Sequence, residues 1–142
     1  MRTEPISETP AADPQAGTRS NPLTTLLACI AGYCVPGLGH ALLRKWDRAA
    51  VFFGSIVLMF AFGLMLDGRV VQPETHGLFA ILKFLSEAGA GLLYWGSLFQ
   101  GIGAGEPTAY TFDYANVFLY VAGLLNMLVI VDAFDIAMGR KQ

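Results

Sequence analysis

The sequence predicts an all-α integral membrane protein, a bundle of about four transmembrane helices. Of its 142 residues, 54% are hydrophobic and 14% are charged, whereas a soluble domain usually carries about 25% charged residues. A chain this short must still cover its core with polar surface, so the shortage of charge indicates that lipid is the outer solvent. Uncharged stretches near the length of about 20 residues that crosses a bilayer recur along the chain. We therefore expect one transmembrane domain over residues 23–138.

The transmembrane domain is expected to lie between a tail, residues 1–22, and a short basic end, residues 139–142. The tail is rich in Pro, Ala, Thr, Ser and Glu and holds one large aliphatic residue, Ile6. This composition cannot bury enough surface to offset the entropy of ordering, so we expect a disordered tail. It also lacks the basic region followed by an apolar core that marks a signal peptide.

The first two spans are expected at residues 23–43 and 49–66. The first has 21 residues without Lys, Arg, Asp or Glu, and Asn21-Pro22 suits its start. A charged cluster with Trp46 at its centre follows, which is typical of the membrane interface. Because only about five residues join the two spans, they are expected to form an antiparallel hairpin.

The third apolar region is harder to assign. Lys83 and Glu87 lie four residues apart, so a helix would place them on one face as an ion pair. The 18 uncharged residues from 88 to 105 include six glycines, which lower helix propensity. We expect an interfacial start near Gly77 and a span at residues 84–102, with re-entrant packing as the alternative.

The fourth span is expected at residues 114–136, after an acidic, aromatic loop at 106–113. If the four spans are plain and the tail is cytoplasmic, the inside holds four cations and the outside three. The positive-inside rule does not decide the orientation on a margin of one. The two sets are Arg19, Arg69, Arg140 and Lys141, against Arg44, Lys45 and Arg48.

The motif Pro36-Gly37-Leu38-Gly39-His40 interrupts the first span. Pro36 removes a helical hydrogen bond, and in lipid the freed carbonyl must find a partner. Gly37 and Gly39 allow a neighbouring helix to approach closely. Two interpretations stay open: a kink with a tight helix contact, or a lipid-headgroup or ligand pocket made from His40, Arg44 and the broken backbone.

Asp132 and Asp135 share one face of the fourth span. Intramembrane carboxylates are costly and are usually paired or face water. Their most suitable partners are His40, Arg44 and Arg48, but four plain spans would put those residues at the opposite side of the membrane. The pairing requires a re-entrant third region or a first segment that does not cross. The pair is then either structural or part of a proton or cation relay.

Other polar residues give weaker signals. Asn126 lies deep in the fourth span and is expected to form an interhelical hydrogen bond. Cys29 and Cys34 would lie on different faces of a helix, so we expect no disulfide between them. We find no metal-ligand spacing, no phosphate loop and no catalytic triad, and therefore expect no metal or cofactor. The net charge of −2, without a basic stripe, argues against nucleic-acid binding.

Two segments carry a resemblance to known families. "PGLGHALLRKWDRA" resembles the bacterial relatives of the two-transmembrane-helix (TM-two type) domain family, which often read Pro-Gly-x-Gly-(His/Gln)-x-Tyr-x-Gly. Here residues 41–44 stand where an aromatic residue and a glycine are common. "AGLLNMLVIVDAFDIAMGRK" resembles a related family of small bacterial membrane proteins of unknown function. The resemblance implies a multi-pass bacterial inner-membrane protein without an established activity, in which the histidine loop and the terminal Asp pair form one structural signature.

The function we expect is non-enzymatic. Short loops and the lack of a catalytic set favour an accessory, assembly or scaffold subunit of the inner membrane. Its expected partners are the lipid bilayer and other membrane proteins or further copies of itself. The alternative is a small transporter or channel protomer with a polar path of Asp132, Asp135, His40 and Arg44.

Overall fold

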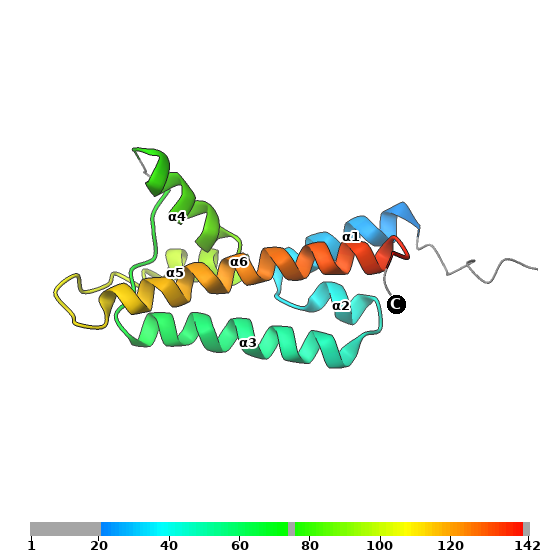
Figure 1. Cartoon of the computed structure of the whole chain (residues 1–142), viewed down its shortest axis with the longest axis horizontal. Helices are drawn as coiled ribbons and strands as arrows, with labels where there is room; N and C mark the ends of the chain where they lie inside the picture. Colours follow the sequence, from blue (N-terminus) through cyan, green and yellow to red (C-terminus); the bar gives the residue numbers. More distant parts are fainter. Residues whose placement is uncertain (1–20, 74–75, 141–142) are drawn as a thin grey trace, which may run out of the picture.

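The computed structural model of the chain describes residues 21–73 and 76–140 and contains six α-helices and no strand in those ranges. The predicted all-α class is therefore confirmed. Almost all of the expected disordered tail lies outside the described residues. The helices are α1 (Pro22–Cys34), α2 (Leu38–Leu42), α3 (Trp46–Met65), α4 (Leu78–Ala88), α5 (Leu92–Gln100) and α6 (Phe112–Ala137) (Figure 1).

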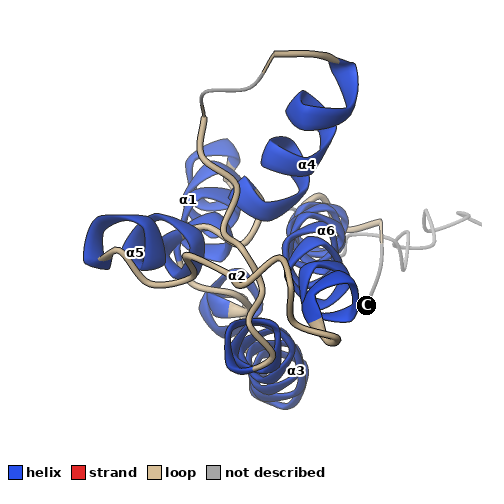
Figure 2. Cartoon of the chain, turned by 90° about the vertical axis from the view of Figure 1, so that its left-hand side faces the viewer, coloured by secondary structure: helices blue, strands red, loops and turns tan. Residues whose placement is uncertain are grey.

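Two helices are long and apolar enough to cross a membrane, α3 with 20 residues and α6 with 26. At 1.5 Å per residue they are about 30 and 39 Å long, against a hydrocarbon core of about 30 Å. They lie side by side and antiparallel along the long axis of the molecule (Figures 1 and 2). They correspond to the second and fourth spans that the sequence predicts.

The first predicted span, residues 23–43, is divided into two helices. The chain leaves α1 at Val35, and the short helix α2 starts after Gly37, whose φ of +77° is left-handed and ends a regular helix. Pro36 supplies no N–H at this break. The 13 residues of α1 extend only about 20 Å. A Cβ on Gly39 would lie 2.6 Å from the carbonyl oxygen of Ala28, so α2 folds back directly onto α1 as a hairpin.

The third apolar region is also broken. Helices α4 and α5 are bent by 106° at a break, so they count as a third span only if they are taken together. The loop before α4 and the loop after α5 are bonded to each other: the Val70 N–H donates to the Gly103 carbonyl at 2.8 Å, and the Glu106 N–H donates to the Asp67 carbonyl at 3.3 Å. The pair therefore begins and ends at one end of the molecule, which is the geometry of the re-entrant alternative.

The two breaks meet near the centre of the molecule. Gly91 has a φ of +64°, and a Cβ there would overlap the carbonyl oxygen of Tyr33 at the end of α1. The Trp95 Nε1–H donates to the Tyr33 hydroxyl at 3.4 Å. A Cβ on Gly89 would lie 2.6 Å from the carbonyl oxygen of Gly123 in α6. Backbone therefore packs against backbone where the hairpins and α6 meet.

The distribution of side chains supports a membrane protein. Large apolar side chains are exposed along the outside of the helices, for example Met65 and Phe99 with 77% and 85% exposed. Fully buried side chains include His40, Glu87 and Asn126. Lipid tolerates an apolar exterior of this extent, and polar side chains within a membrane usually face the bundle interior.

We predict that Gly91→Ala strongly destabilises the protein. The added methyl would overlap the Tyr33 carbonyl, and overpacking costs about 1–3 kcal/mol. The left-handed φ adds about 1–2 kcal/mol for a residue with a Cβ. Gly54→Ala is the matched control, because a Cβ at that position in α3 meets nothing within 4 Å and should stabilise by up to about 1 kcal/mol. The measurement is the unfolding free energy in mixed micelles, and equal values for the two variants would contradict the contact between the breaks.

Candidate functional site

The centre of the candidate site is a pair between α2 and α6. The Nε2 atom of His40 lies 3.1 Å from Oδ2 of Asp132. The His40 side chain is fully buried, whereas 25% of the Asp132 side chain is exposed. The imidazole also contacts the Phe52 ring of α3 edge-on, with centroids 5.0 Å apart. His40 therefore connects the short helix α2 to both long helices.

The antiparallel arrangement of α3 and α6 makes this pair possible. Because α2 directly precedes α3, it lies at the end of the molecule where α3 begins and α6 ends (Figure 1). A Cβ on Gly39 would lie 3.3 Å from the Cβ of Ala133, so the absence of a side chain lets α2 approach α6. The sequence made this pairing conditional on a re-entrant third region or a first segment that does not cross. The structure has the re-entrant geometry in α4 and α5, and this geometry returns the end of α6 to the start of α3.

Asp135 and Arg44 occupy more exposed positions near this pair. Oδ1 of Asp135 lies 3.8 Å from Nη1 of Arg140, and 68% of the Arg140 side chain is exposed. Arg44 is exposed on the turn between α2 and α3 and has a φ of +60°. It stands where the resembled family has a glycine, so the left-handed turn forms without one. A surface contact such as Asp135–Arg140 contributes little to stability.

The groove beside these carboxylates lies between α3 and α6 and has a volume of about 310 Å³. Asp132 and Asp135 line it together with apolar residues such as Phe52 and Val129. Asp132 therefore both lines this groove and contacts His40 through its Oδ2.

Asn126 makes the predicted interhelical hydrogen bond. Its Nδ2 donates to the carbonyl of Gly89 at 2.8 Å, and the side chain is fully buried. This carbonyl belongs to the break between α4 and α5, where the helical acceptor sites end. Asn126 therefore satisfies a backbone group that lipid could not.

The sequence analysis missed the buried hydrogen bonds of Glu87 and Tyr94. Oε2 of Glu87 accepts a hydrogen bond from the Val71 N–H at 2.7 Å, and the Tyr94 hydroxyl donates to the Val71 carbonyl at 2.7 Å. Glu87 is fully buried, whereas Lys83, its expected ion-pair partner, is exposed. The sequence signal for a buried role of Glu87 was its position, because it is the last charged residue before 18 uncharged ones.

The opposite end of the molecule is held by one bond between a loop and α6 and by one bond within a loop. The Arg69 N–H donates to Oδ1 of Asn116 at 2.8 Å. The Thr108 hydroxyl donates to Oε1 of Glu106 at 2.6 Å, and this hydrogen bond lowers the pKa of Glu106. The carboxylate of this loop is therefore held in its charged form.

The buried polar groups are mostly used to connect helices and loops. Within the described residues, three buried side-chain atoms lack a hydrogen-bond partner: His40 Nδ1, Glu87 Oε1 and Asn126 Oδ1. Each belongs to a side chain whose other polar atom is bonded. The same part of the chain holds no group of three or more His, Cys, Asp or Glu residues that could bind a metal ion, and Cys29 and Cys34 are free thiols.

We predict a measurable coupling between His40 and Asp132. His40→Leu, Asp132→Leu and the double variant form a double-mutant cycle, and the double variant should be more stable than the sum of the single effects implies. Coupling energies within membrane bundles average about 0.6 kcal/mol and reach about 1.7 kcal/mol. Asp135→Asn is the control and should change the unfolding free energy by less than about 0.5 kcal/mol. A coupling energy of zero would show that the pair does not hold the hairpin.

Comparison with known proteins gives a family without an assigned activity. No curated protein and no solved structure matches the chain. A family model matches residues 27–142, which include both helix breaks, both long helices and the His40–Asp132 pair. The chain therefore belongs to a family of unknown function, DUF6677.

Proposed function

We propose that this protein is a non-enzymatic, multi-pass protein of the bacterial inner membrane that acts as an accessory, assembly or scaffold subunit. The observation that carries the proposal is the contrast between the interior of the bundle, which holds polar side chains, and its exterior, which is apolar. Polar side chains inside the bundle bind the broken hairpins to α6 and to the loops, while large apolar side chains along α3 and α6 face outward. Such an exterior suits lipid and the helices of partner proteins. The relation to the TM-two type family is part of this proposal.

The positions of the cations support a cytoplasmic location for both chain ends. The start of α3 and the end of α6 lie at one end of the molecule (Figure 1), and the adjoining sequence holds Arg44, Lys45, Arg48 and Arg140. By sequence, Arg19 and Lys141 are added to these. Arg69 and Lys83 belong to the loop and helix of the other end. Six cations against two is a clear bias under the positive-inside rule. The margin of one for four plain spans came from counting both the first segment and the third region as crossings.

We predict that Asn21→Cys, Lys45→Cys and Arg140→Cys are labelled by an impermeant maleimide only from the cytoplasmic side. Gln72→Cys and Thr108→Cys should be labelled only from the opposite side, because α3 and α6 are the crossing helices. Cys29 and Cys34 are first replaced by serine, and labelling of intact and opened cells is compared. Labels at positions 21 and 45 on opposite sides would contradict a first segment that returns.

A small transporter or channel protomer is the second candidate. The observation that favours it is the contact of His40 with Asp132, whose carboxyl borders the groove between α3 and α6. Protonatable residues inside a bundle are typical of proton and ion pathways. Against it stands the tight backbone packing where the two breaks meet.

We predict that the protein, purified through a C-terminal tag in a gentle detergent from its native host, retains a stoichiometric protein partner. The outward apolar faces provide the packing surface for it. The control is the Gly91→Ala variant, which should lose the partner together with its fold. Isolation as a partner-free homo-oligomer that conducts protons in vesicles, with loss of flux but not of protein in Asp132→Asn, would favour the transporter instead.

A further inference from the structure

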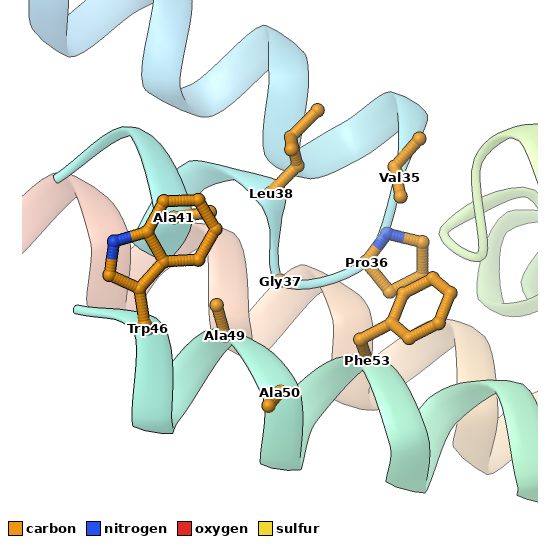
Figure 3. A pocket seen from close by; sticks show the side chains of 9 residues that line it. All are labelled: Val35, Pro36, Gly37, Leu38, Ala41, Trp46, Ala49, Ala50 and Phe53. Carbon is orange, nitrogen blue, oxygen red and sulfur yellow. The ribbon is translucent and has the colours of Figure 1, made fainter. Parts of the chain in front are cut away.

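An apolar groove of about 290 Å³ lies between α2 and α3, beside the first helix break. Figure 3 shows Trp46 at one end of it and Pro36 with Phe53 at the other. Ala49 and Ala50 line it between these ends, and their small side chains leave the space open. The groove is thus a pocket with apolar walls that is open to the outside of the bundle.

The groove runs inward from the basic end of the molecule. Trp46 is the first residue of α3 and Phe53 lies seven residues later, which is about 10 Å along the helix. Gly37 forms the wall on the side of the break, where a Cβ would lie 2.6 Å from the carbonyl oxygen of Ala49. The long axis of the groove therefore follows α3, the direction that a lipid acyl chain takes beside a crossing helix.

The outer end of the groove carries the chemistry of a headgroup site. The Trp46 side chain is 69% exposed, and tryptophan favours the headgroup level of a bilayer. Arg44 and Lys45 are exposed on the turn directly before it. Asp47 and Arg48 follow on the first turn of α3, so this segment has a net charge of two positive units. Cations at such a position attract anionic lipids.

We propose that this groove binds one acyl chain of an anionic phospholipid, with the headgroup phosphate held by Arg44 and Lys45. The inference rests on the proposed membrane location, in which this end faces the anionic cytoplasmic leaflet. Charge complementarity selects the lipid, and the apolar groove accepts its chain. The buried His40, which one of the two interpretations of the sequence placed in a headgroup or ligand pocket, faces Asp132 and does not line this groove.

The test uses the fluorescence of Trp46 in a Trp95→Phe background. The full chain is placed in vesicles of unbrominated phosphatidylcholine. To these is added a small fraction of a lipid with brominated acyl chains, which is either phosphatidylglycerol or phosphatidylcholine. Bromine quenches a nearby indole, so we expect brominated phosphatidylglycerol to quench Trp46 at several-fold lower mole fraction than brominated phosphatidylcholine.

Two sets of variants test headgroup binding and acyl-chain binding separately. Arg44→Gln and Lys45→Gln should each raise the mole fraction of brominated phosphatidylglycerol needed by about fivefold, and Arg69→Gln, at the opposite end, should not. Ala50→Phe should fill the groove and reduce the maximal quenching, whereas Ala61→Phe, on α3 outside the groove, should leave it unchanged.

Equal quenching by the two brominated lipids, unaffected by the charge variants, would overturn the proposal and leave ordinary annular lipid in the groove. Protection of Trp46 from both lipids by a co-purified protein would overturn it in favour of a partner helix. Vesicles made only of brominated phosphatidylcholine provide the separate check on membrane location. If they leave Trp46 unquenched without such a partner, the proposed location fails, and the lipid site fails with it.

Discussion

The fold depends on how backbone groups at two helix breaks are satisfied in apolar surroundings. Each interrupted helix leaves unpaired carbonyl and N–H groups, and lipid offers them no partner. Here the carbonyl of Gly89 accepts from Asn126, while Gly91 packs against the carbonyl of Tyr33 at the other break. Each hairpin therefore covers part of the backbone at the break of the other hairpin and separates it from lipid. Helices α3 and α6 provide the frame, but the broken segments hold their places because the two breaks lie together.

The His40–Asp132 pair and the returning third region are consequences of the same constraint. A third region that crossed the membrane would make α6 parallel to α3 and carry Asp132 to the end opposite His40, and each would need another partner. With the third region returned, the imidazole reaches the carboxyl at 3.1 Å and α2 is bound to α6. Apolar side chains in lipid give helices little directional preference, because the lipid tails are as apolar as the side chains. A buried polar pair supplies that preference for a helix of five residues.

The sequence predicted the long helices because a long uncharged stretch with charges at its ends is a local property of α3 and α6. It did not predict the division of residues 23–43, since 21 uncharged residues satisfy the length criterion whether Pro36 kinks the helix or ends it. That outcome depends on the fit of Gly37 against Ala49 and of Gly39 against Ala28, which is tertiary. Glu87 was assigned to Lys83 for a similar reason. The spacing of four residues predicts contacts only within one helix. The hydrogen-bond partner of Glu87 is the N–H of Val71, which is 16 residues away in a loop.

The two halves of the chain have the same order of elements and run in opposite directions along the molecule. Helices α1 to α3 and helices α4 to α6 each consist of a broken hairpin followed by a long helix, and the long helices are antiparallel (Figure 1). In each half a glycine with positive φ, Gly37 or Gly91, precedes the second short helix. Inverted-topology repeats are found in many secondary transporters, where the substrate and ion sites lie at the interface between the repeats. Each hairpin also carries a buried imidazole or carboxyl group, that of His40 or Glu87, which binds it to another part of the molecule. Because the two anchors have different partners, α6 and the loop at Val71, the halves share a topology without sharing a site.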